Sequence, residues 1–359
     1  MADLLAAELE RIGRAAGLDA FGIAGADPFD DTRRALEDRK ERGLSGGMQF
    51  TYRDPERSTD PARALSGAKA LIVGARSYRR RDDDDHDRAT STGVVARYSW
   101  IDHYEPLRRA LGHVADELRA QGWKAVVLAD DNALVDRAAA HRAGLGFFGK
   151  NTNLLLHDGR GSEFVLGAIV TDAPLAVHAP QAAGQTDDTA CGPCNRCLPA
   201  CPTGALVAPG VLDARRCLAW LLQADGPFPR EHRRALGGRI YGCDECQDAC
   251  PPNRLQVRRT PPPPAEPHAE PIVDLLDLLE TAAGDDATLL ARHGRWYIAR
   301  RDATFLRRNA LVALGNVGDL ADERTRAVIA RYRADPDPLL REHAAWARDE
   351  LGARATAGR

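Results

Sequence analysis

The sequence lacks the features that would direct a chain to a membrane or indicate a highly charged partner. No apolar run is long enough to span a bilayer. The first residues carry neither the positive nor the apolar region of a secretory signal, which predicts a cytoplasmic protein. Lys and Arg number 49 against 52 for Asp and Glu, a net charge of −3. Overall charge therefore does not indicate nucleic-acid binding, and such a site would have to be local.

Cysteine is absent outside one stretch, and that stretch holds all 8 cysteines of the chain. Their spacing is C-x2-C-x2-C-x3-C-P, then an isolated Cys, then C-x2-C-x3-C-P. This resembles two-cluster ferredoxins, in which the fourth Cys of each run binds the other cluster. The rule predicts two [4Fe–4S] clusters, one on each of two sets of thiolates: Cys191, Cys194, Cys197 and Cys250; Cys201, Cys217, Cys243 and Cys246.

Zinc and disulfides are the alternative uses of these cysteines. Zinc also binds paired C-x2-C motifs, but zinc ribbons usually lack the run of three and the terminal Cys-Pro. Disulfides are disfavoured because no secretory segment opens the chain. Iron–sulfur clusters are therefore the favoured reading, and we expect a protein that transfers electrons one at a time.

The chain is too long for a ferredoxin alone, and its patterns predict an α+β protein of several domains. Apolar runs at 70–73, 125–128 and 164–170 predict strands, and 107–120 has the spacing of an amphipathic helix. Three later segments, 303–314, 322–333 and 338–351, read as HEAT-like helical repeats. The predicted parts are an α+β domain at 1–185, a ferredoxin-like domain with two clusters at 186–256, a proline-rich linker at 257–273 and a helical domain at 274–359.

Asp130 and Asp131 follow the strand expected at 125–128, and ligands often lie at strand ends. Neighbouring carboxylates and burial both raise a carboxyl pKa, which would leave one of the pair able to donate a proton near neutral pH. Adjacent strand residues point to opposite faces, so at most one can face a site. The alternative is a pair that caps the following helix.

Three glycines lie close together in the segment 143–151. They would let the backbone pass close to a flat or bulky ligand, and a plain glycine-rich turn is the alternative. The G-x-G-x-x-G spacing of 144–149 does not follow an expected strand, so a dinucleotide site is not expected.

Taken together, these motifs resemble the epoxyqueuosine reductase family, which contains cobalamin and iron–sulfur enzymes of tRNA queuosine synthesis. The cysteine pattern matches throughout, including Tyr241-Gly242-Cys243-Asp244. The resemblance covers almost the whole chain, and only the combination of motifs is specific to the family. The other matching segments are 17–24, Gly47–Phe50 with Arg57, Ala96–Tyr98, 143–151 and Arg308–Asn316.

The resemblance implies reduction of epoxyqueuosine at the wobble position of tRNA. It implies a nitroreductase-like, cobalamin-binding domain in 1–185, a tRNA-binding domain in 274–359, and an external low-potential electron donor. It aligns Asp130 with the family's acid, and it places five residues near cobalamin: Arg57, Asp130, Lys150, Asn151 and Ser162. All eight cysteines are assigned to clusters, so none remains to bind cobalt. The oligomeric state stays open, with a monomer as the working expectation.

This sequence departs from the family pattern near the implied site. His103-Tyr104-Glu105 stands where the family shows Asp-Tyr-His, Ala133-Leu134 replaces Pro-Val, and Ala224 replaces an acidic residue. The substrate is therefore less certain than the cofactors. The alternatives are a cobalamin-dependent reductase of another substrate, similar to reductive dehalogenases, and a non-catalytic iron–sulfur electron carrier, which predicts no corrinoid.

A basic stretch with aromatic residues lies at Arg295–Arg301 and is followed by Arg307 and Arg308. Such a stretch could meet an RNA backbone and stack on an unpaired anticodon base. The alternative places Trp296 and Tyr297 in the core and the arginines on a solvated face.

Overall fold

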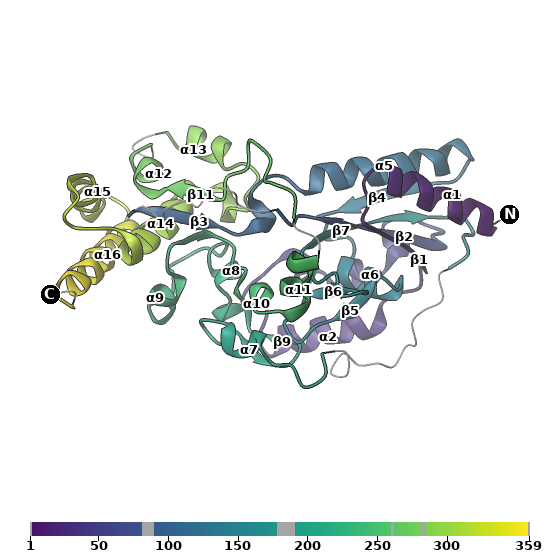
Figure 1. Cartoon of the computed structure of the whole chain (residues 1–359), viewed down its shortest axis with the longest axis horizontal. Coiled ribbons are helices and arrows are strands. Elements are labelled where there is room, and N and C mark those ends of the chain that lie inside the picture. The colour runs from purple at the N-terminus through teal and green to yellow at the C-terminus, as the bar shows by residue number, and fades with distance from the viewer. Residues whose placement is uncertain (1, 81–89, 178–190, 260–261, 282–284, 358–359) are drawn as a thin grey trace.

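The computed structural model describes residues 2–80, 90–177, 191–259, 262–281 and 285–357. Its largest sheet has four antiparallel strands in the order β1-β2-β7-β4 (Figure 1). Apolar side chains fill these strands, and Ile72 lies opposite both Ile23 and Ile169. The three strands expected from the sequence are confirmed. The four strands are β1 Ala20–Gly25, β2 Ala70–Ser77, β4 Ala125–Ala129 and β7 Phe164–Thr171.

Helices cover both faces of this sheet, which explains why its central strands are apolar without alternation. On one face, α1 (Ala2–Ala15) and α5 (Tyr104–Ala120) pack against the sheet, with Leu107 and Leu111 fully buried. On the other face lie α2 (Asp30–Glu41) and α6 (Asp136–Arg142). The helix expected at 107–120 is thus confirmed, and the chain mixes helix and sheet.

A second, three-stranded sheet takes one strand from each of three distant stretches of sequence. Its order is β10-β3-β11, with β10 (Arg239–Tyr241) parallel and β11 (Ile272–Asp274) antiparallel to the central β3 (Thr92–Val95). Figure 1 shows β3 and β11 side by side although their residues lie far apart in the sequence. Backbone hydrogen bonds therefore join the N-terminal part, the cysteine-rich part and the helical part.

The cysteine-rich part consists of short helices and loops with one two-stranded ribbon. Because these elements bury little apolar surface of their own, bound clusters and neighbouring segments must supply much of their stability. The elements are α7 Cys197–Ala200, β8 Leu206–Ala208, β9 Val211–Leu212, η3 Ala214–Arg216, α8 Leu218–Leu221, η4 Arg230–His232, α9 Arg233–Leu236, α10 Glu245–Asp248 and α11 Pro251–Arg259.

The C-terminal part is helical, and the three long helices expected there are confirmed as α14 (Ala303–Val317), α15 (Glu323–Arg333) and α16 (Pro338–Ala357). Twelve residues of α14, Leu311 among them, are buried. No described helix has the length and apolar character needed to cross a membrane. The preceding elements are α12 Leu275–Thr281, α13 Asp286–Arg292 and η5 Ala299–Arg301.

The predicted domain boundaries stay predictions. The boundary at residue 185 lies outside the described residues. At the linker predicted for 257–273, α11 continues to Arg259 and β11 begins at Ile272, so both ends of that segment carry regular structure.

Candidate active site and cluster region

Asp130 follows β4 directly and has a left-handed backbone, with φ of 56°. This conformation is unfavourable for residues other than glycine and tends to persist at functional sites. Asp131 makes the turn instead, because its Oδ1 accepts a hydrogen bond of 2.8 Å from the Ala133 amide. Helix α6 begins only at Asp136, so the pair does not cap it. Within the described chain, no hydrogen bond or ion pair holds the Asp130 carboxylate.

The protein around Asp130 raises the pKa of its carboxyl. Partial removal from water is the main cause, although the residue keeps an open side to solvent; the nearby Arg108 opposes the rise, and Asp102 and Asp131 add to it. A carboxyl with a raised pKa stays protonated at higher pH than an ordinary aspartate. Asp130 therefore has an unpaired carboxyl among the described residues, and its pKa is shifted in the direction that favours a proton donor.

Arg57 lies beside the loop that carries Asp130. It belongs to α4 (Pro55–Ser58), which follows α3 (Phe50–Arg53) and precedes η1 (Pro61–Arg63). The next residue, Ser58, donates a 2.6 Å hydrogen bond to the carbonyl of Asn132. This bond joins α4 to the chain two residues after Asp130. A pocket of about 290 Å³ opens here, lined by Phe50, Arg53, Asp54, Arg57, Ser58 and Asn132.

Lys150 and Asn151 contact the cysteine-rich part and are both buried. Lys150 Nζ donates to the carbonyl of Gly192 at 2.8 Å and to Oδ1 of Asn195 at 3.0 Å. Asn151 Nδ2 donates to the carbonyl of Cys246 at 3.5 Å. These two side chains therefore hold loops that carry predicted cluster ligands.

Ser162 belongs to a buried polar network that joins the two parts. Its Oγ donates to Oε1 of Gln247 at 2.9 Å and accepts from Nδ2 of Asn253 at 3.1 Å. Tyr78 donates to the same Gln247 oxygen at 3.0 Å. Of the five residues predicted to approach cobalamin, only Arg57 and Asp130 thus have side chains free of other described partners.

The glycines of 143–151 serve a tight hairpin between β5 (Gly146–Phe148) and β6 (Leu154–Leu156). A Cβ on Gly146 would lie 2.0 Å from the carbonyl oxygen of Leu155. Gly144 has φ of 73°, which disfavours other residues. Chain packing therefore accounts for these glycines, as in the plain-turn alternative.

The eight cysteines are free thiols, each partly buried. Burial raises the pKa of Cys250 to about 11, and nearby Cys191, Cys197 and Cys194 raise it further. Burial likewise raises the pKa of Cys246, with added effects of Cys243, Cys217, Cys201 and Cys197. Cys246 is thus affected by Cys197 of the other predicted set as well, so these charge effects bring the cysteines together without dividing them into two sets. Among the described residues, no three His, Cys, Asp or Glu side chains converge on a single metal ion.

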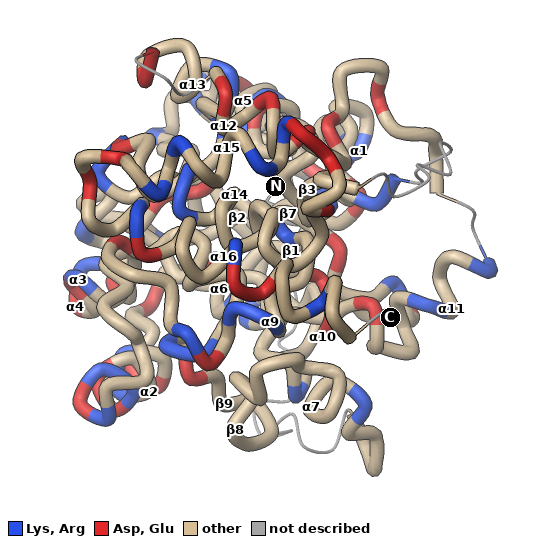
Figure 2. The backbone as a smooth tube through the Cα atoms, turned by 90° about the vertical axis from the view of Figure 1, so that its left-hand side faces the viewer, with Lys and Arg blue, Asp and Glu red and all other residues tan. Residues whose placement is uncertain are grey.

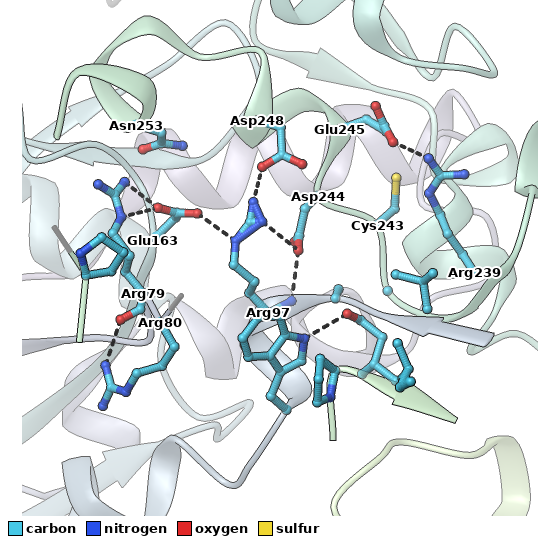
Figure 3. A pocket seen from close by; sticks show the side chains of 18 of the residues that line it. Arg79, Arg80, Arg97, Glu163, Arg239, Cys243, Asp244, Glu245, Asp248 and Asn253 are labelled. Atoms are coloured by element: carbon cyan, nitrogen blue, oxygen red, sulfur yellow. Dashed lines mark hydrogen bonds and ion pairs between the residues drawn. The ribbon is translucent and has the colours of Figure 1, made fainter. Parts of the chain in front are cut away.

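A partly buried ion cluster between the N-terminal and cysteine-rich parts was not predicted from the sequence. Arg97 pairs with Glu163 at 3.2 Å, with Asp244 at 3.8 Å and with Asp248 (Figure 3). Its backbone amide also donates to Asp244 at 2.8 Å. Burial raises the pKa of Asp244 to about 6, although Arg97 acts in the opposite direction. These side chains line a cavity of about 700 Å³ that also reaches Cys243.

Tyr241 of the cysteine-rich part contacts the C-terminal part. Tyr297 donates its backbone N–H to Oη of Tyr241 at 2.8 Å. Burial is the main cause that raises the pKa of Tyr241 to about 12, and the charge of Asp130 adds to it. Trp296 is buried and stacks on Tyr241, with ring centroids 4.8 Å apart, whereas Tyr297 is 56% exposed.

Several residues that were expected to form an RNA-binding surface are buried in the structure. Arg308 is fully buried and donates to the carbonyls of Leu221, Ala224 and Gly226. Arg307 is also buried and pairs with Asp286. Together with Trp296 these residues belong to the interior, so their assignment to an RNA surface was wrong. Tyr297, Arg300 and Arg301 remain exposed.

The structure shows the burial and contacts of the positions that depart from the family pattern. His103 is buried near the Tyr78 ring, and burial lowers its pKa to about 4, so it is neutral at physiological pH. Glu105 is exposed and pairs with Arg109 at 2.5 Å. Ala133 is buried, and the Ala224 carbonyl accepts the 2.9 Å bond from Arg308.

Comparison with known proteins identifies the family to which this chain is similar. Residues 190–253 match the model of a 4Fe-4S double cluster binding domain. An epoxyqueuosine reductase from Xanthomonas campestris is 34% identical, with 97% of this chain and 96% of that protein aligned. The Bacillus subtilis enzyme of that name is 33% identical, over 96% of this chain and 87% of that protein.

Solved structures agree with the sequence comparison. A crystal structure of epoxyqueuosine reductase with an epoxyqueuosine-modified tRNA-Tyr stem loop matches with a TM-score of 0.83 and 31% identity, over 97% of this chain and 90% of that one. A Bacillus subtilis structure with its catalytic loop swung out of the active site matches at 0.82, also with 31% identity and the same coverage. With this identity along nearly its whole length, the chain belongs to the epoxyqueuosine reductase family.

Proposed function

We propose that this protein reduces epoxyqueuosine in tRNA to queuosine, with Asp130 as the proton donor. The observation that carries the proposal is the free carboxyl of Asp130, with its raised pKa, on a loop tied to the Arg57 pocket. The test is anaerobic incubation of the reduced protein with epoxyqueuosine-bearing tRNA, followed by nucleoside analysis. Queuosine should accumulate; unchanged epoxyqueuosine would contradict the proposal.

The reaction removes an epoxide oxygen and leaves a carbon–carbon double bond. It consumes two electrons and two protons and releases the oxygen as water. Asp130 is placed to give a proton to the departing oxygen, which otherwise would leave as an unfavourable anion. Cobalamin, when bound, would supply a metal centre able to reduce carbon.

The residues near Asp130 could bind the side groups at one edge of such a cofactor. The Arg57 guanidinium has no partner among the described residues and can donate to amide or phosphate oxygens. The pocket beside it, about 290 Å³, accommodates a side group rather than a whole corrin. Three other predicted residues would act indirectly, because they fix the cluster loops against the nitroreductase-like domain. They are Lys150, Asn151 and Ser162.

The proposal includes the predicted domain division: 1–185 for cobalamin, 186–256 for two clusters, 257–273 as a linker and 274–359 as a HEAT-like domain for tRNA. A cytoplasmic location follows from the tRNA substrate. An external low-potential donor must supply the electrons, because nothing in the reaction does.

Cys217 tests how the thiolates are divided between clusters. It is the isolated cysteine; burial raises the pKa of its thiol, and Cys201 of the same predicted set adds to the rise. We expect Cys217→Ser to lose roughly half of the bound iron, because one four-thiolate set becomes incomplete. Iron and sulfide analysis of oxygen-free protein measures this. Loss of all iron, or of none, would contradict the division.

Tyr297 and Arg300 test the tRNA surface. Both are exposed, and Tyr297 is bonded to Tyr241, whereas Arg300 lies 3.6 Å from Asp225. Arg300 and Arg301 have left-handed backbones, with φ of 53° and 54°. We expect Tyr297→Ala to weaken tRNA binding by about 1–3 kcal/mol if the ring stacks on an unpaired base. Arg300→Glu should also reduce the salt dependence of binding. Filter binding at several salt concentrations measures both, with Arg333→Glu as a control on an exposed face of α15.

A further inference from the structure

Helix α11 begins directly after Cys250, a predicted ligand of the first cluster, and extends toward solvent. The Arg254 amide donates to the carbonyl of Cys250 at 3.2 Å, so the helix is anchored at that cysteine. Arg254, Arg258 and Arg259 are exposed, and so are Leu255 and Val257, at 46% each. The short helix thus combines positive charge with apolar surface next to a redox centre.

These arginines have no partners in the described part of the chain. The side chains of Arg254, Arg258 and Arg259 make no hydrogen bond or ion pair there. Neither does the side chain of the exposed Arg196, which lies between Cys194 and Cys197. Other exposed arginines, such as Arg109 with Glu105, pair within their own helix. Among the described residues, the arginine charge around the first cysteine set is therefore unpaired.

This surface lies away from the proposed substrate pocket. Figure 2 shows α11 projecting at one edge of the molecule, with basic residues along it, and α3 and α4 at the opposite edge. A carrier docked on α11 would therefore not cover the pocket beside Arg57. The direct connection of α11 to Cys250 favours a redox partner at this surface.

We propose that α11 is the docking surface for an acidic one-electron carrier that reduces the first cluster. The inference rests on the proposed function, which requires an external donor. Unpaired surface charge raises the rate of encounter with an oppositely charged carrier by about 10- to 1000-fold at low salt. Leu255 and Val257 would give the encounter complex apolar contact near Cys250.

The experiment compares two ways of reducing the clusters in intact, cluster-loaded protein. One reductant is reduced plant-type ferredoxin, which is acidic, and the other is dithionite, which needs no docking surface. Stopped-flow absorbance follows cluster reduction directly, without tRNA or turnover. The test variant is Arg254→Glu with Arg258→Glu, and the matched control is Arg333→Glu with Arg348→Glu, which are also exposed and unpaired.

We expect the test variant to be reduced by ferredoxin at least about tenfold more slowly at low salt, with a flatter salt dependence. Its reduction by dithionite and its tRNA affinity should match wild type, and the control should be unchanged throughout. Equal ferredoxin rates in test and control variants would overturn the proposal. Loss of tRNA affinity in the test variant would overturn it too and assign α11 to RNA. Absence of queuosine formation with normal ferredoxin reduction would instead count against the proposed function alone.

Discussion

Replacing Asp130 by Asn is expected to reduce epoxide reduction by about 100- to 10,000-fold, the usual contribution of a general acid. Asn has nearly the same shape but no proton of suitable acidity. Iron content, corrinoid content and tRNA affinity should stay at wild-type values, since no other described group depends on the Asp130 carboxylate. Single-turnover assays of prereduced protein with epoxyqueuosine-bearing tRNA measure the loss.

The neighbouring residue provides a matched control. Asp131→Asn should retain activity, because an amide oxygen can accept the hydrogen bond from Ala133 that shapes the turn. Full activity of Asp130→Asn would refute the role of the acid. Equal losses in both variants would point to a disturbed loop instead.

The raised pKa of Asp130 also sets the sign of the pH dependence. The acid must be protonated to act, so the rate should fall as pH rises through its pKa. That fall should occur at higher pH than for an ordinary aspartate. In Asp130→Asn the residual rate should lose this dependence, and a single-turnover pH profile of both proteins checks it.

Arg97→Met is expected to lower the free energy of unfolding by about 3–5 kcal/mol, because it leaves carboxylates without their cation at a buried site. Glu163 is buried and keeps Arg79, but Asp244 loses its main partner (Figure 3). Urea unfolding under anaerobic conditions measures the loss. Arg109→Met is the control, since its exposed pair with Glu105 should contribute little.

The effect of Arg97→Met should depend on pH. Burial already raises the pKa of Asp244 to about 6, above that of an unfolded chain. The folded state therefore binds this proton more tightly, and stability falls as pH rises from about 4 to about 6. Without Arg97 the pKa rises further, so the damage should be largest near neutral pH and shrink in acid. A second change, Asp244→Asn, should recover part of the loss; no recovery would exclude Asp244 as its source.

The parts of this molecule that the sequence predicted are those with local signals. Each of these features has a pattern that can be recognised from residues close together in the sequence. They are the cysteine spacing, the apolar strands such as 164–170 and the three C-terminal helices. The role of Asp130 stays a prediction: strand ends are frequent ligand sites, and the family resemblance singled it out from Asp131.

The features that were missed depend on residues far apart in the sequence. The partners of Arg97 lie 66, 147 and 151 residues away, so no local pattern indicates that they meet. Arg308 looked like surface charge, because composition cannot show that three carbonyls would receive its guanidinium inside the protein. Lys150 likewise matched a family position without revealing that it bonds to Gly192.

The three-stranded sheet has a consequence for how the protein is made. Its central strand β3 leaves the ribosome long before either of its partners, β10 and β11, has been translated. Until then both edges of β3 lack their final hydrogen bonds, and bare strand edges invite association between nascent chains. The N-terminal part therefore cannot complete its folding during early translation. Completion must wait until residue 274 has emerged, so a stalled or prematurely terminated chain would be a target for chaperones and proteases.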